Sequence, residues 1–133
     1  MNRILHTLLL CSVVAIATLP ASAAELATQK SSSRGVTVDV TPRNINESTK
    51  TWDFKIVLDT HSEALNDDLV KSTVLVTGGI RHTPLAWEGD PPGSHHREGT
   101  LKFTPVKPLP EIIELQIRRP GETSPRSFQW KLR

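Results

Sequence analysis

From Gly35 onward, apolar and polar residues alternate in short runs that are separated by turn residues. Such alternation places every second side chain on one face, so each run predicts a half-buried β-strand. The clearest runs are Val36 to Val40, which Pro42 closes, and Trp52 to Leu58, where four large apolar residues share one face. Further strands are predicted at residues 73–77, 83–87, 99–103, 112–117 and 128–132.

Seven short strands without a long helical period indicate an all-β domain. An immunoglobulin-like antiparallel β-sandwich of about seven strands fits this count and length, and a small barrel is the main rival. Pro84 favours an edge position for strand 83–87, because proline cannot donate a hydrogen bond to a neighbouring strand. The one candidate helix spans residues 62–70 and has one or two turns.

The first 23 residues have the three parts of a secretory signal. Arg3 supplies positive charge, the stretch from Ile4 to Leu19 is almost entirely apolar, and Ala21 to Ala23 fits the small-residue cleavage pattern. This apolar stretch is shorter than the roughly 20 residues that a transmembrane helix needs. We therefore expect a signal peptide at 1–23, cleavage after it, and a periplasmic or secreted protein. An uncleaved signal is the alternative and would be the only link to a membrane.

The rest of the chain is expected to form one domain after a short leader. Residues 24–34 are polar and rich in serine and are interpreted as a flexible leader, and residues 35–133 are the predicted β-sandwich. The only cysteine, Cys11, lies within the signal, so stability must come from packing without disulfides. The 16 Lys and Arg residues nearly balance the 14 Asp and Glu residues, which argues against a nucleic-acid partner.

Three histidines are the strongest candidates for chemistry. His61 follows the second strand, and His95 and His96 lie in the loop before strand 99–103. Imidazole nitrogen suits copper and zinc, so these three residues predict a copper or zinc site if the end of the second strand and the loop lie at the same rim of the sandwich. Residues that would lie beside these ligands are Asp59, Glu88 and Arg97.

Other interpretations of the same residues stay open. Neighbouring residues of an extended strand point to opposite faces, so His95 and His96 share a metal only if the chain bends there. Each histidine can equally bond to a backbone carbonyl or face solvent. Ser62 and His61 also face opposite ways, which gives no nucleophile–base pair, and we do not expect an enzyme. The paired carboxylates at 67 and 68 are expected on a solvated helix or turn.

The segment from Trp87 to Gly99 has unusual local composition. Pro91 and Pro92 stiffen the chain, and Gly93 allows a sharp turn. One interpretation is a recognition loop on a rigid scaffold. In the other, Trp87 fills the core, Arg97 pairs with Asp59 or Glu88, and the prolines only shape the connection.

Two segments, LDTHSEAL at 58–65 and WEGDPPGSHHREGTL at 87–101, carry a resemblance. The pattern Asp-Thr-His-Ser followed by Trp-x-Gly-x-Pro-Pro-Gly-x-His-His-Arg-x-Gly resembles a group of small exported or membrane-anchored prokaryotic proteins of unassigned activity. The resemblance implies an immunoglobulin-like sandwich and makes the histidines at 61, 95 and 96 and Arg97 signature positions. It implies no substrate, cofactor or reaction. Ser94 departs from the pattern, which has glycine there.

These observations lead to two hypotheses about function. The first is a non-enzymatic periplasmic binding protein that takes a copper or zinc ion, or a partner, through the rim that carries His61 and the 87–99 loop. The second is a structural or protein-interaction β-sandwich module without a small ligand, which uses the exposed edge at 83–87. The partner protein is unknown in both.

Overall fold

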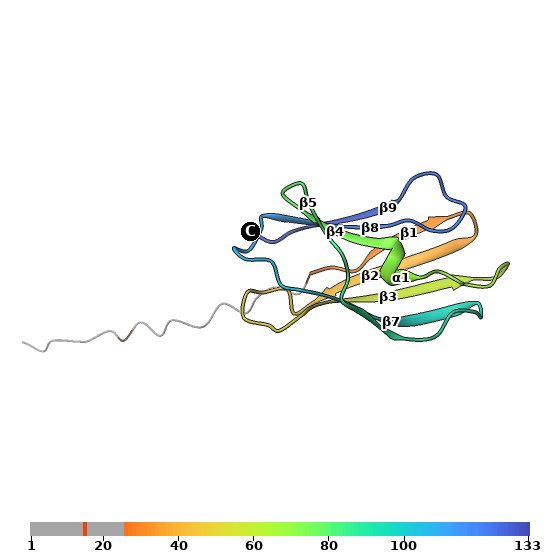
Figure 1. Cartoon of the computed structure of the whole chain (residues 1–133), viewed down its shortest axis with the longest axis horizontal. Coiled ribbons are helices and arrows are strands. Elements are labelled where there is room, and N and C mark those ends of the chain that lie inside the picture. The colour runs from red at the N-terminus through yellow and green to blue at the C-terminus, as the bar shows by residue number, and fades with distance from the viewer. Residues whose placement is uncertain (1–14, 16–25) are drawn as a thin grey trace, which may run out of the picture.

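The computed structural model describes residue 15 and residues 26–133 of the chain. The predicted signal peptide at 1–23 therefore lies outside the described residues, except for Ala15. The described part is all-β, with nine strands in two antiparallel sheets and a single helical turn (Figure 1). Within it, no helix has the length and apolar character that a membrane crossing requires.

The two sheets share one core. The five-stranded sheet has the order β1-β2-β3-β7-β6, and the four-stranded sheet has the order β5-β4-β8-β9. The strands and the helical turn are β1 (Gln29–Ser33), β2 (Val36–Arg43), β3 (Trp52–Thr60), α1 (Leu69–Ser72), β4 (Thr73–Thr77), β5 (Ile80–His82), β6 (Ala86–Gly89), β7 (His96–Phe103), β8 (Ile112–Ile117) and β9 (Arg126–Lys131).

Alternation along the strands builds the core as the sequence predicts. Every second residue of β2 and β3 is buried, and the residues between them are partly or fully exposed. Phe54 of β3 meets Phe103 of β7 edge to face, with ring centroids 5.5 Å apart, and also packs against Trp130 of β9. The aromatic side chains of both sheets therefore fill the space between them, where apolar burial supplies the main stabilisation.

The described residues contain nine strands where about seven were expected, and β1 is one of the two additions. Gln29–Ser33 lies within the residues interpreted as a flexible leader, but it pairs with β2 through a two-residue turn. Arg34 and Gly35 of that turn have φ values of 51° and 76°, the left-handed conformation that tight hairpins of this type require. The strand carries no apolar residue, so the alternation pattern does not reveal it.

The second addition is β5, Ile80–His82, which joins the four-stranded sheet and lies outside every predicted strand. The strand expected at 83–87 begins later than predicted and forms β6 at the edge of the five-stranded sheet. Residues 83–85 cross between the sheets, and Pro84 is buried in this crossover rather than lying in an edge strand. The helix expected at 62–70 is reduced to α1, which Asp68 caps by accepting a hydrogen bond from the Lys71 backbone.

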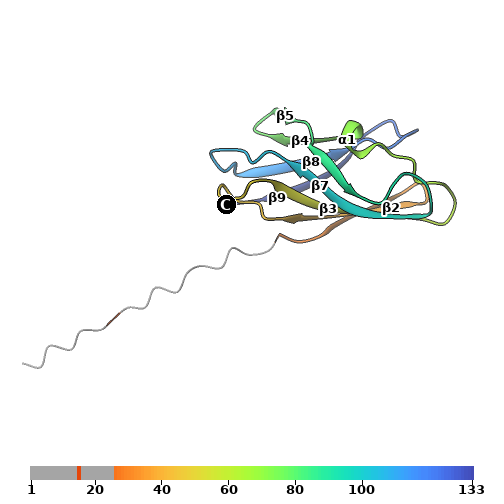
Figure 2. The ribbon, with the colours of Figure 1, turned by 60° about the horizontal axis from the view of Figure 1, so that its bottom comes forward.

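Four connections meet at one end of the molecule, which we call the loop pole. They are the β1–β2 turn, residues 61–68 after β3, the β6–β7 loop at 90–95 and the β8–β9 loop at 118–125. These connections lie together at the right-hand end in both ribbon views (Figure 1, Figure 2). The pairing of β3 with β2 and β7 explains this placement, because Thr60 lies opposite Val36 and donates its backbone N–H to the His95 carbonyl.

Candidate functional site at the loop pole

The histidines predicted as ligands all lie at the loop pole, and their side chains are exposed. His61 begins the connection after β3, His95 precedes β7, and His96 is the first residue of β7. The topology therefore brings the two predicted segments to one end of the sandwich. Residues 60 and 95 are joined there by a backbone hydrogen bond of 2.9 Å.

His96 forms a charged cluster on the outer face of the five-stranded sheet. It lies opposite Asp59 in the ladder between β3 and β7. Its Nδ1 is 2.5 Å from Asp59 Oδ1, and its Nε2 is 3.5 Å from Glu98 Oε2. The hydrogen bond to Asp59 raises the pKa of His96 above its ordinary value of 6.5, and Glu98 adds a smaller effect of the same sign. Both ring nitrogens therefore face carboxylates.

The described residues contain no group of three or more His, Cys, Asp or Glu side chains placed to hold a metal ion. His96 pairs with carboxylates on its own sheet face, and no hydrogen bond joins the side chains of His61 and His95 to it in the described part. The copper or zinc site on these three histidines stays a prediction.

The residues expected beside the histidines have separate partners. Asp59 contacts His96, but Glu88 pairs with Lys102 on the outer sheet face at 3.7 Å. Arg97 points inward, and only 2% of its surface is exposed. The alternative in which Arg97 pairs with Asp59 or Glu88 is wrong, because successive residues of β7 point to opposite faces and Arg97 is directed into the molecule.

Arg97 joins two of the connections at the loop pole. Its guanidinium donates to the backbone carbonyls of Leu65 at 3.2 Å, Asp67 at 2.8 Å and Asp90 at 3.3 Å. The Trp87 ring lies over it at 5.7 Å, which is a cation–π distance, and the indole N–H also donates to the Asp90 carbonyl. The Trp87 ring thus covers the buried Arg97 guanidinium and also packs against the hydrophobic core.

A buried ion pair fixes the next two connections to each other. Arg119, the second residue after β8, donates from Nε and Nη2 to the two carboxylate oxygens of Asp67, at 3.0 Å each. The Arg119 side chain is 4% exposed and the Asp67 side chain is 0% exposed. Burial by itself lowers the pKa of Arg119, but the hydrogen bonds and charge of Asp67, together with the charges of Glu63 and Glu122, more than offset this, so the pKa of Arg119 is raised.

Arg126 at the start of β9 fixes the last connection. Its guanidinium donates two hydrogen bonds to the Glu122 carboxylate, at 2.9 and 3.1 Å. It also donates to three backbone carbonyls around the β1–β2 turn. Those acceptors belong to Ser31, Ser33 and Val36. Glu122 is also 3.7 Å from Arg119, so the network runs without a break from residues 61–68 to the β1–β2 turn.

The sequence pattern did not single out Arg119, Glu122 or Arg126, and it led us to expect Asp67 at a solvated position. A signal was present, because each buried arginine continues the inward series of its own strand at a spacing of two residues. Arg119 follows Ile113, Leu115 and Ile117, and Arg126 precedes Phe128 and Trp130. Arg97 likewise precedes Gly99, Leu101 and Phe103. The spacing of two residues does not identify the carboxylate or carbonyl that each buried arginine contacts.

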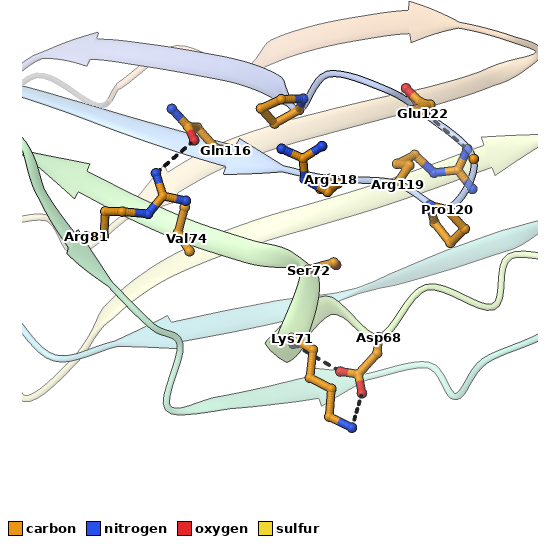
Figure 3. Close-up of a pocket in the computed structure, with 12 residues that line it drawn as sticks. Asp68, Lys71, Ser72, Val74, Arg81, Gln116, Arg118, Arg119, Pro120 and Glu122 are labelled. Atoms are coloured by element: carbon orange, nitrogen blue, oxygen red, sulfur yellow. Dashed lines mark hydrogen bonds and ion pairs between the residues drawn. The ribbon is translucent and has the colours of Figure 1, made fainter.

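A groove of about 490 Å³ adjoins the loop pole on the outer face of the four-stranded sheet. Val74 and Gln116, which are paired in the ladder between β4 and β8, belong to its lining. Arg81 of β5 and Arg118, directly after β8, reach over the same face of the sheet (Figure 3). The β8–β9 loop and α1 complete the lining, so the groove is continuous with the loop pole.

Two of the three arginines that line this groove, Arg81 and Arg118, bond only to neutral oxygens. Arg81 Nη1 is 3.5 Å from Gln116 Oε1, and Arg118 Nη1 donates to the Thr123 carbonyl at 3.1 Å. Within the part of the chain that the structure describes, neither forms an ion pair. The groove therefore combines an open, partly apolar surface with two guanidinium groups whose charge is available.

Comparisons of the chain with protein-family models, with curated proteins and with solved structures find no match. The resemblance to small exported prokaryotic proteins accordingly stays a prediction.

Proposed function

We propose that this chain is an exported, non-enzymatic β-sandwich of immunoglobulin-like type that binds a protein partner through its loop pole and the adjoining groove. The strand order supports the type. The order β2-β3-β7-β6 corresponds to strands A-B-E-D of an immunoglobulin domain, and β4-β8-β9 corresponds to C-F-G. In this scheme β5 takes the place of C′, and β1 is an additional edge strand.

The observation that carries the proposal is the distribution of buried charge. Four charged residues are buried in the described part of the chain, and all of them lie at the loop pole: Asp67, Arg97, Arg119 and Arg126. Burying charged groups costs several kcal/mol for each ion, and an apolar replacement is often as stable. A role in positioning explains their presence better than stability does.

That positioning role fits partner binding. The three arginines join four connections that are far apart in the sequence, so exposed residues of those connections keep one arrangement relative to each other. Loops held on a rigid scaffold are the usual place for binding residues, and a preorganised surface loses less conformational entropy on association. His61, Ser62 and His95 are exposed members of this surface.

Site-specific photo-crosslinking in the producing organism tests the proposal. The full chain carries a photoreactive amino acid in place of Ser62 or His95 at the loop pole. Matched controls carry it in place of Lys50 or Lys107, which are also exposed but lie in the connections at the opposite end. We expect discrete covalent adducts from the loop pole and none from the controls. Equal adducts from both ends, or adducts from neither, would contradict the proposal.

A further inference from the structure

The groove beside the loop pole has the chemistry to select one class of partner. We infer that it binds an acidic, extended peptide segment of the partner, with carboxylates paired to Arg81 and Arg118. This inference rests on the proposed function and names the partner feature that the groove recognises.

The charge of the groove is not balanced by its own acidic residues. Four basic and two acidic side chains line it. Both acids are already engaged, since Glu122 chelates Arg126 and Asp68 caps α1 and pairs with Lys71 at 3.8 Å. Arg119 is neutralised by Asp67, which leaves Arg81 and Arg118 as the cations open to a ligand.

A third carboxylate on the same sheet face is also engaged. Glu114 accepts hydrogen bonds from Ser127 at 2.5 Å and Gln116 at 3.0 Å. These bonds lower its pKa, and the charge of Arg81 adds a smaller effect. Glu114 is therefore ionised and held by its neighbours, and it weakens the field of Arg81 without forming an ion pair with it.

The side chains of the groove favour a peptide over other anionic polymers. Arginine binds carboxylates through two parallel hydrogen bonds, which suits Asp and Glu side chains. No aromatic residue lines the groove, although stacking on such rings is a principal way of binding single-stranded nucleic acid. Val74, Pro120 and Pro125 instead offer apolar surface to the side chains between the carboxylates.

The dimensions agree with a short segment. The volume of about 490 Å³ falls within the range of roughly 300–1,000 Å³ that is common for ligand pockets. Arg81 lies in β5 and Arg118 directly follows β8, and the two side chains approach the groove from separate positions (Figure 3). Two carboxylates on one extended peptide can therefore be bound together, one at each guanidinium.

Fluorescence anisotropy with a labelled ten-residue peptide of alternating Glu and Val tests the inference on the full mature chain. The matched peptide has Gln in place of each Glu. We expect the Glu peptide to bind and the Gln peptide to bind at least roughly tenfold more weakly. Binding of the Glu peptide should weaken as salt is added, because exposed charge pairs are screened. Equal binding of both peptides would overturn the inference.

Variants then locate the site. Arg81→Glu, and Arg81→Glu combined with Arg118→Glu, should each weaken the Glu peptide, the double variant by roughly tenfold or more, because like charges would then face each other. The control Arg43→Glu/Lys50→Glu makes the same charge change at exposed positions away from the groove. An equal loss in the control, or no loss in the groove variants, contradicts the inference. Thermal melting verifies that each variant is folded.

Competition and self-association experiments distinguish the acidic peptide from two other occupants, phosphate and a second copy of the chain. Inorganic phosphate that displaces the peptide at lower concentration than glutarate would identify a phosphate site and overturn the carboxylate assignment. Sedimentation showing self-association that Arg81→Glu/Arg118→Glu abolishes would make a second copy the occupant and would also overturn it. If the photo-crosslinks at the loop pole persist while peptide binding fails, the proposed function stands and only the acidic segment is rejected.

Discussion

Two adjacent carboxylates, Asp67 and Asp68, have opposite surroundings. Asp68 is exposed and caps α1, as expected for a solvated turn. Asp67 is fully buried in its ion pair with Arg119, so the expectation of a solvated position is wrong for it. The partner lies 52 residues further along the chain, and nothing in the local sequence distinguishes the two acids.

Replacing the buried carboxylate should therefore cost far more stability than replacing its neighbour. We expect Asp67→Asn to lower the free energy of unfolding by about 3–5 kcal/mol, because it removes the charged group that the buried Arg119 guanidinium contacts through two hydrogen bonds. Asp68→Asn keeps a capping side chain and should change it by less than about 0.5 kcal/mol. Urea denaturation measures both. Similar losses in the two variants would contradict the role assigned to Asp67.

His96 should make stability depend on pH near neutrality. Its pKa is raised in the folded state by the hydrogen bond to Asp59, so the folded protein binds its proton more tightly than the unfolded chain. This contribution is fully present below pH 6.5 and is lost as pH rises through the higher folded pKa. His96→Gln should remove that part of the pH dependence in urea denaturation between pH 5 and 9.

Nuclear magnetic resonance provides an independent measurement of the same effect. The imidazole of His96 should titrate above 6.5, and Asp59→Asn should move its pKa back toward that value. His61 in the same spectra serves as an internal control, because no hydrogen bond or ion pair joins its side chain to this cluster in the described part of the chain. A His96 titration that Asp59→Asn leaves unchanged would show that the contact is absent in solution.

At the scale of elements, β6 and β7 approach closely through a glycine pair. Gly89 and Gly99 are opposite each other in the ladder. A Cβ atom on Gly99 would lie 2.6 Å from the Gly89 Cα and 2.7 Å from the Trp87 ring. Glycine here lets the indole lie against the backbone while it covers Arg97, which is the close approach that glycine within a strand often marks.

A methyl group at this crossing should therefore disturb the packing of β6. We expect Gly99→Ala to lower the free energy of unfolding by about 1–3 kcal/mol, because the added atom forces backbone or indole to shift. Thr100→Ala, the next residue of β7 and on the outer face, is the matched control and should cost less than about 1 kcal/mol. Denaturation followed by tryptophan fluorescence gives both values, and equal costs would argue against the tight contact.

The strand β1 illustrates how an element forms without an apolar pattern. Its backbone pairs with β2, and the Gln29 side chain bonds to the backbone of Gln129 in β9. Arg126 accounts for two more carbonyls of the strand. Side-chain hydrogen bonds thus join β1 and β9, which are edge strands of different sheets. Hydrophobic periodicity does not predict such a contact.

For the molecule as a whole, the predicted export determines the compartment in which the protein can bind a partner. The signal at 1–23 predicts that the protein isolated from the producing cell begins at Ala24. Intact-mass measurement of the periplasmic or secreted fraction verifies this. A chain that retains Met1 and sediments with membranes would instead support the uncleaved anchor.

The sequence by itself determined the all-β class and most inward-facing positions, because a period of two residues is a local property of each strand. It left open whether His61 and His95 lie at the same end, which the pairing of β3 with β7 decided. Only the tertiary structure decided which charges are buried and what they contact. Arg126 and Val36 are 90 residues apart in the sequence. Their hydrogen bond depends on how the two sheets pack together and not on the residues next to either one in the sequence. The groove that Arg81 and Arg118 share likewise exists only once β5 and β8 lie in one sheet.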